Sequence, residues 1–181
     1  MKKIIAFALA ALLALGLASC GGTADPGGKQ IDTKPGSPID TADNFSYTYD
    51  GVLITLGAAP EPVLAALPEP SYSREDESCA IPGAIDNINS YPGLDLYVTY
   101  PEAGEAPFIT SVRLMDDSIA TPEGLYVGDP AEKIAELQGQ YDEEKSGFYY
   151  YYKGESSLMI SVGADGTVDQ IIYDYIFLDE Q

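Results

Sequence analysis

Four consecutive tyrosines, Tyr149, Tyr150, Tyr151 and Tyr152, are the most unusual group of potential ligand-binding side chains in this sequence. They lie in a segment typical of a strand, where successive side chains point to opposite faces. Tyr149 and Tyr151 would then share one face and Tyr150 and Tyr152 the other, so one pair must lie on the less buried face. Tyrosine offers flat apolar area and a hydroxyl, which suits a peptide, a glycan or a cell-wall polymer. The alternative is cross-strand aromatic packing that only stabilises the sheet.

Acidic residues gather in Arg74-Glu75-Asp76-Glu77 and in Asp116-Asp117, which we expect in or near loops. Asp86-Asn87-Ile88-Asn89-Ser90 places oxygen-bearing side chains at alternate positions, as a calcium-binding loop does. The segment lacks the central glycine and the closing glutamate of such a loop. We therefore predict no metal site and no cofactor, and we interpret these acids as solvated loop charge.

The sequence contains no histidine, the commonest general base and a common metal ligand. It also lacks a Gly-x-Ser-x-Gly motif and a glycine-rich phosphate-binding motif. Paired carboxylates can hydrolyse glycosidic bonds, but the acids here are scattered and nothing fixes their separation. We expect no catalytic residues, and a cell-wall or glycan hydrolase is the less favoured alternative.

The N-terminus has the features of an export signal. Met1 to Lys3 is positively charged, and Ile4 to Leu17 is an uncharged apolar run that is short for a membrane span. The run ends in Leu17-Ala18-Ser19-Cys20, which resembles the lipobox of bacterial lipoproteins. The resemblance implies that the Cys20 thiol takes a diacylglycerol and that cleavage makes Cys20 the first residue. The alternatives are an ordinary secretory signal and an uncleaved anchor helix.

A diacylglyceryl anchor on Cys20 implies a lipid-anchored protein on the extracytoplasmic face of the cell membrane. Cys79 then has no partner for an intramolecular disulfide, and its context in Ser78 to Ile81 predicts a buried, unreactive thiol. The net charge of −20 repels nucleic acid and anionic lipid headgroups. We expect no nucleic-acid partner, and we expect membrane attachment through the lipid alone.

The composition divides the chain into three parts. Residues 1–19 form the predicted signal peptide. Residues 20–44 are rich in glycine, proline and polar side chains without hydrophobic periodicity, which predicts a flexible tether. Residues 45–181 form the predicted single folded domain.

Within the domain one plan occurs twice, over residues of about 45–117 and 118–178. An extended piece leads into a short helix in each copy, with Pro60 and Pro130 in the first turns. We expect Asp129 to be the second helix's N-cap and Glu132 to close a capping box. Strands are predicted at 46–54, 94–100, 108–115, 148–153, 158–162 and 167–177, with a hairpin turn at Asp165-Gly166. The predicted fold is α+β: two tandem αβββ-like repeats in one antiparallel sheet, with the short helices on one face.

The two helix starts share a spacing, in which Gly57, Pro60, Leu64 and Leu67 correspond to Gly128, Pro130, Ile134 and Leu137. The pattern over residues 46–177 resembles the β-lactamase-inhibitor-protein-like folds and the small outer-membrane assembly lipoproteins. That resemblance implies a helical element before a three- or four-stranded sheet, singly or in duplicate. The chain lacks the paired cysteines of the inhibitor proteins, and a shared fold does not carry function. No functional residue is transferred from these families.

These observations predict a lipid-anchored, non-catalytic binding or interaction module at the cell surface. One of the two tyrosine pairs would contact a protein or a cell-wall polymer. The alternative is an assembly or inhibitor protein that docks another envelope protein.

Overall fold

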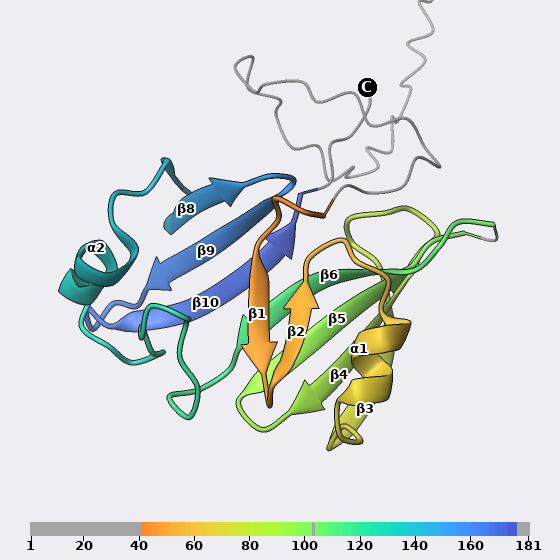
Figure 1. The fold of residues 1–181 in the computed structure, drawn as a ribbon. Coiled ribbons are helices and arrows are strands. Elements are labelled where there is room, and N and C mark those ends of the chain that lie inside the picture. The colour runs from red at the N-terminus through yellow and green to blue at the C-terminus, as the bar shows by residue number, and fades with distance from the viewer. Residues whose placement is uncertain (1–40, 103, 177–181) are drawn as a thin grey trace, which may run out of the picture. The chain divides into compact units, whose positions relative to one another are not determined.

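The structure is a computed structural model that describes residues 41–102 and 104–176. The predicted signal peptide, Cys20 and the tether up to residue 40 lie outside the described residues. The elements, in chain order, are β1 (Ser46–Tyr49), β2 (Val52–Thr55), α1 (Glu61–Ala66), β3 (Tyr72–Glu77), β4 (Ile85–Tyr91), β5 (Leu94–Tyr100), β6 (Phe108–Leu114), α2 (Glu132–Gln138), β7 (Glu143–Lys145), β8 (Phe148–Lys153), β9 (Ser156–Val162) and β10 (Val168–Tyr175) (Figure 1).

Eight strands form one antiparallel sheet in the order β3-β4-β5-β6-β10-β9-β8-β7. The chain therefore builds each half of the sheet from one end to the centre, and the two halves meet where β6 pairs with β10. Helix α1 precedes the strands of the first half, and α2 precedes those of the second. The predicted α+β fold, with two tandem repeats sharing one antiparallel sheet, is confirmed. Each repeat contributes four strands to this sheet, β3–β6 and β7–β10, and not the three of the predicted αβββ unit.

The segment predicted as a single strand over 46–54 is a hairpin of β1 and β2. Its turn is Asp50-Gly51, and both residues have positive φ, 49° and 79°. Positive φ at both central residues defines the type I′ turn, whose twist matches that of paired strands. The single-strand prediction was wrong because it passed over this Asp-Gly turn.

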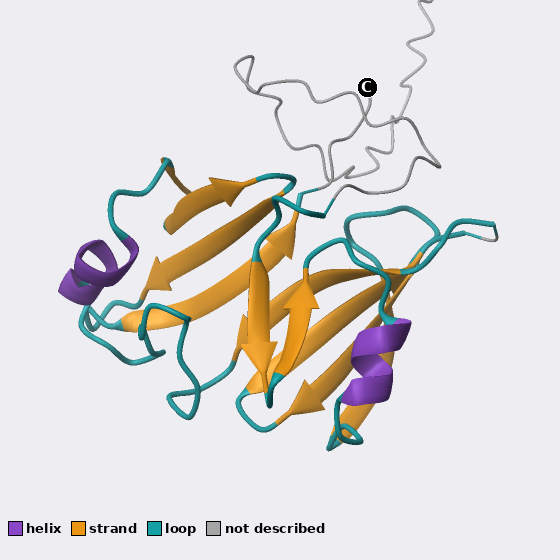
Figure 2. Cartoon of the chain, viewed as in Figure 1, coloured by secondary structure: helices purple, strands orange, loops and turns teal. Residues whose placement is uncertain are grey.

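The hydrophobic core lies on one face of the eight-stranded sheet. Leu96, Val112 and Ile171 are fully buried there, and Ile54 of the hairpin belongs to the same cluster. Val63 of α1 and Ile134 of α2 also join it. Figure 2 shows the hairpin and α1 in front of this face. The prediction that the short helices cover one face is confirmed.

The two helices begin differently. Helix α1 starts at Glu61, and Pro60 is the N-cap residue directly before the first turn in which it was predicted. Helix α2 starts only at Glu132, because Pro130 forms an isolated bridge with Thr167 and is held outside the helix. The Asp129 carboxylate therefore accepts bonds from the Tyr126 amide, at 3.0 Å, and the Lys133 ammonium, at 2.6 Å. The predicted Asp129 N-cap and capping box were wrong.

Helix α2 ends at Gln138, and Gly139 is its C-cap residue, with a φ of 79° in the region that favours glycine. Neither α1 nor α2, the two helices of the described ranges, is long and apolar enough to cross a bilayer.

The folded part includes Asn44, which the sequence analysis assigned to the tether. Asn44 is only 3% exposed. Its side-chain amide donates to the Leu56 carbonyl at 2.9 Å, and its side-chain oxygen accepts from the Glu155 amide at 2.8 Å. These bonds join the start of the fold to the residue after β2 and to the β8–β9 turn.

Candidate functional site

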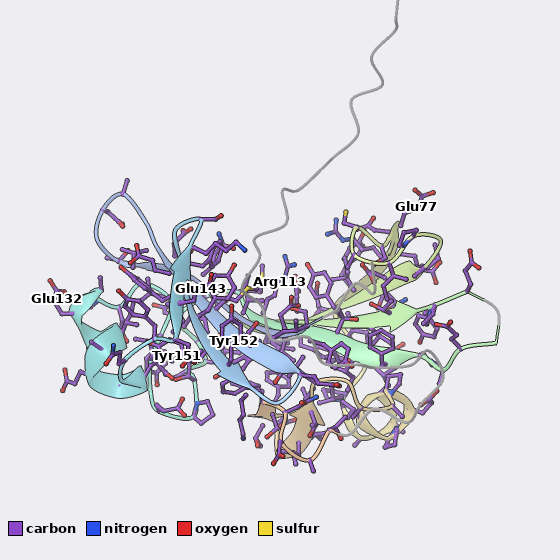
Figure 3. The ribbon with its side chains drawn as sticks, turned by 90° about the horizontal axis from the view of Figure 1, so that it is seen from above. Glu77, Arg113, Glu132, Glu143, Tyr151 and Tyr152 are labelled. Atoms are coloured by element: carbon purple, nitrogen blue, oxygen red, sulfur yellow. The ribbon has the colours of Figure 1, made fainter. Side chains whose placement is uncertain are left out.

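The face of the eight-stranded sheet that points away from the core carries no helix or strand among the described residues (Figure 3). Side chains on this face lie opposite one another in register and form a row across seven strands. From β3 to β8 the row is Arg74, Ile88, Tyr97, Ser111, Asp174, Ser157 and Tyr152. We call the surface that carries this row the open face. Figure 3 shows Arg113 and Glu77 projecting on this side, away from β1, β2 and α1.

The four predicted tyrosines divide between the two faces. Tyr150 and Tyr152 lie on the open face, and the Tyr152 side chain is 45% exposed. Tyr149 and Tyr151 lie on the core side, where Tyr151 donates to the Gly139 carbonyl at 3.2 Å. This second pair lines a small apolar crevice of about 170 Å³ beneath α2. Only Tyr150 and Tyr152 are therefore placed on the uncovered surface.

An aromatic ladder runs along β8 on the open face. Ring centroids are 6.3 Å apart between Phe148 and Tyr150 and 5.9 Å apart between Tyr150 and Tyr152. The Tyr152 hydroxyl donates to a Glu143 carboxylate oxygen at 2.6 Å. Partial burial and this carboxylate hold the pKa of Tyr152 well above its usual range. Tyr152 thus stays neutral with its hydroxyl engaged, and it offers mainly ring surface to a partner.

A cavity of about 330 Å³ opens on the other half of the open face. Strands β3, β4, β5, β6 and β10 and the loop after β3 surround it. Its lining contains four carboxylates and two guanidinium groups: Asp76, Glu77, Asp86, Asp174, Arg74 and Arg113.

Arg113 forms part of the cavity wall. Its guanidinium lies over the Tyr97 ring, 4.3 Å from the centroid, a cation–π arrangement. Its Nε is buried and has no hydrogen-bond acceptor within the described ranges. A buried donor without an acceptor costs free energy unless a ligand or water supplies one.

Asp174 faces Arg113 diagonally across the β6–β10 pair. Burial raises the pKa of Asp174 to about 6, an effect that Ser111 and the positive charge of Arg113 partly oppose. The negative charge of Asp86 raises this pKa further. The carboxylate is therefore kept in an environment that disfavours its charge, a frequent property of functional sites.

The cavity carboxylates are incompletely compensated. The ion pairs among residues 41–102 and 104–176 are Arg74 with Asp76, at 3.4 Å, and Lys133 with Asp129, at 2.6 Å. Neither involves Asp174 or Asp86. Asp86 instead accepts a hydrogen bond from the Thr99 hydroxyl at 2.5 Å.

The calcium-loop interpretation of Asp86 to Ser90 is excluded by its geometry. The segment is strand β4, in which successive side chains point to opposite faces, so Asp86 and Ser90 lie on one face and Asn87 and Asn89 on the other. The oxygens are divided between the two faces and do not form a calcium-binding loop. The acidic segment Arg74 to Glu77 is likewise strand β3 and not a loop. Asp116-Asp117 lies in a loop, as predicted, and Asp116 accepts from the Ser118 amide at 2.9 Å. The part of the chain that the structure describes has no group of three or more His, Cys, Asp or Glu side chains positioned for a metal ion.

Cys79 is exposed, which corrects the prediction of a buried thiol. Ser78 to Ile81 belongs to the turn region between β3 and β4, outside the strands of the sheet. The thiol lies at the cavity described above.

Sequence reasoning missed Tyr97, Arg113 and Asp174 as site residues. One signal was present: Arg113 and Asp174 are charged residues inside strongly apolar strands, in Val112-Arg113-Leu114 and Tyr173-Asp174-Tyr175. A charge at such a position faces either solvent or a site.

No protein-family model matches the sequence, and no curated protein matches it. Among solved structures, a cysteine-rich secretory protein from Staphylococcus aureus is similar with a TM-score of 0.43 and 9% identity. The match covers 66% of this chain and 44% of that protein, so the chain matches less than half of its length. A likeness at this level supports no conclusion about fold or function.

Proposed function

We propose that this protein is a lipid-anchored, non-catalytic binding module on the extracytoplasmic face of the cell membrane, and that its open face binds a partner protein. The observation that carries the proposal is the composition of that face. An aromatic ladder and a charged cavity lie on one continuous sheet surface, joined by the row from Arg74 to Tyr152. This surface has no covering layer within the described ranges.

The chemistry of the open face favours a protein over a glycan. A second row places Tyr150, Met159, Ile172 and Arg113 in register on β8, β9, β10 and β6. Tyrosine, methionine and arginine are enriched at the centres of protein–protein interfaces. A glycan site needs free polar groups beside flat rings, whereas the Tyr152 hydroxyl is bonded to Glu143 and the rings of Tyr150 and Tyr152 stack on each other.

The location rests on the N-terminal sequence. Leu17-Ala18-Ser19-Cys20 supports lipid attachment at Cys20, and the polar segment after it supplies reach between the membrane and the domain. The net charge of −20 over the whole sequence disfavours contact with anionic headgroups and favours a partner with a basic surface.

The test of the open face begins with cross-linking in the native cell, identification of the linked protein and its purification. Binding of that protein is then measured with the unchanged chain and with the Tyr150→Ala, Tyr152→Ala double variant. We expect the double variant to weaken binding at least about tenfold, because central aromatic residues dominate interface energies. The control is Tyr126→Ala, an exposed tyrosine outside the open face. Equal affinity of the double variant and the control would refute the proposal.

The anchor has its own test, mass spectrometry of the mature N-terminus. We expect the first residue to be Cys20 carrying a diacylglyceryl group, and Cys20→Ala to remain as unlipidated precursor. A mature N-terminus at another residue, without lipid, contradicts the membrane assignment.

A further inference from the structure

The cavity over β3 to β6 and β10 has a chemistry of its own that the aromatic ladder does not explain. We propose that this cavity receives a basic side chain of the partner protein, with Asp174 and Asp86 attracting its ammonium or guanidinium group. This inference rests on the proposed function, because it assigns a specific chemical requirement to the partner that the open face binds.

The cavity lining carries an excess of negative charge, which favours a cationic ligand. The lining has twice as many carboxylates as guanidinium groups, and Arg74 is already paired with Asp76 at 3.4 Å. Asp86 and Asp174 remain without a basic side chain in contact, and the charge of Asp86 acts unfavourably on Asp174. A cation bound in the cavity is attracted by both carboxylates, and this attraction is strong because the site is partly shielded from water.

Arg113 supplies a second, independent argument. Its stacking on Tyr97 holds the guanidinium against the sheet, where it forms a wall of the cavity. Its buried Nε has no acceptor within the described part of the chain. A peptide segment brings an acceptor with every residue, since each main-chain carbonyl oxygen accepts a hydrogen bond. An inserted basic side chain would thus offset the excess negative charge of the lining, and a neighbouring carbonyl would offer a hydrogen-bond acceptor to the Arg113 side chain.

Size argues for an organic group over a metal ion. The cavity of about 330 Å³ is roughly ten times the share of liquid volume, about 30 Å³, that one water molecule occupies. The carboxylates come from different strands, and none of the described groups of acids is arranged to hold a metal. A long, flexible side chain with a charged end fits such a site.

The experiment measures binding of a blocked peptide, acetyl-Ala-Ala-Lys-Ala-Ala-amide, to the full-length protein. The comparison peptide replaces lysine with norleucine, which has nearly the same shape and no charge. Binding is followed by calorimetry and by the rate of alkylation of Cys79, an exposed thiol at the cavity. We expect the lysine peptide to bind saturably and to slow alkylation, and the norleucine peptide to do neither.

Two variants localise the binding. Asp174→Asn should weaken binding of the lysine peptide at least about tenfold, because it removes one partner of a charged hydrogen bond. Asp169→Asn is the matched control, because Asp169 is an exposed carboxylate on the same strand outside the cavity lining. Its affinity should equal that of the unchanged protein.

Failure of this inference is distinguishable from failure of the proposed function. If both peptides bind alike, or if Asp174→Asn and Asp169→Asn behave alike, the cavity assignment is overturned. If the Tyr150→Ala, Tyr152→Ala double variant still weakens binding of the partner protein in that case, the open face remains the binding surface. If the lysine peptide binds but no open-face variant changes binding of the partner protein, the cavity does not receive a side chain of that partner, and the proposal is overturned on that ground.

Discussion

Asp174 shows at the scale of one residue how the cavity lowers the stability of the fold. Its carboxyl has a pKa of about 6 in the folded protein, above the value of 3.8 expected for an exposed aspartate. The folded state therefore binds more protons than the unfolded state between about pH 4 and 6. Since stability falls with pH wherever the folded state binds more protons, the protein loses stability as pH rises through this window.

Asp174→Asn removes this cost and gives the first prediction. At about pH 8, where Asp174 is charged, the variant should raise the free energy of unfolding by about 1–2 kcal/mol. At about pH 4, where the carboxyl is protonated in the folded protein, the gain should largely disappear. Urea unfolding at the two pH values measures both quantities. A variant that is destabilised equally at both would show that Asp174 contributes a structural hydrogen bond instead.

Tyr173 and Tyr47 give a second prediction at this scale. Their rings pack together in the core with centroids 5.6 Å apart, but their hydroxyls differ. The Tyr47 hydroxyl donates to the Ala120 carbonyl at 2.8 Å, whereas the buried Tyr173 hydroxyl has no partner within the described ranges. Tyr47→Phe should lower the free energy of unfolding by about 1 kcal/mol, because it removes a hydrogen bond. Tyr173→Phe should leave the free energy of unfolding unchanged or raise it. Thermal unfolding of the two variants decides this, and a larger loss from Tyr173→Phe would contradict it.

At the scale of elements, the sequence predicted the strands whose apolar alternation reports burial, such as β5 with Leu94, Leu96 and Val98. It did not predict β4, Ile85–Tyr91, and it did not predict β3 and β7, the two strands that form the edges of the sheet. Every residue of both strands is exposed, and charges fill most positions, so the amphipathic pattern of a strand is absent. Charged edges prevent the sheet from pairing with another chain, and the same charges led us to interpret β3 as a loop.

The candidate site was predictable in part. Alternation along β8 separates Tyr150 and Tyr152 from Tyr149 and Tyr151 without knowledge of the fold. The cavity was not predictable, because Tyr97, Arg113 and Asp174 come from three strands and meet only through the pairing of β6 with β5 and with β10. A single sequence carries no information on that register.

The β8–β9 turn yields a prediction about how the start of the fold is held. Gly154 has a φ of 58°, and a Cβ there would lie 2.9 Å from the Asp43 carbonyl oxygen and would also contact the Asn44 side chain. Gly166, in the β9–β10 turn, has a φ of 83° and no neighbouring atom within 4 Å of such a Cβ. Gly166→Ala should cost about 1 kcal/mol from backbone strain alone.

Gly154→Ala should lower the free energy of unfolding clearly more than Gly166→Ala, because the backbone of residues 43 and 44 must also move. Chemical unfolding of the two variants gives the comparison. Equal losses of stability would mean that residues 43 and 44 can move without loss of free energy and are not held against β8 and β9.

At the scale of the molecule, the duplicated plan leaves the two faces of one sheet with different roles. Both helices and the β1–β2 hairpin contribute to the single core on one face. The other face brings together strands from both repeats, so its central row combines Tyr97 and Ser111 of the first with Asp174 and Tyr152 of the second. In the proposed function, Cys20 holds the protein at the membrane, the polar tether gives it reach, and the open face meets the partner.

The most direct test of this account is site-specific photo-cross-linking in the native cell. A photoreactive phenylalanine derivative replaces Tyr152 on the open face in one strain and Leu53 on the hairpin in another. Both positions are well exposed, at 45% and 60%, and they lie on opposite sides of the core. The account predicts a specific cross-linked protein from position 152 and none from position 53. The same product from both positions, or a product from position 53 alone, would contradict it.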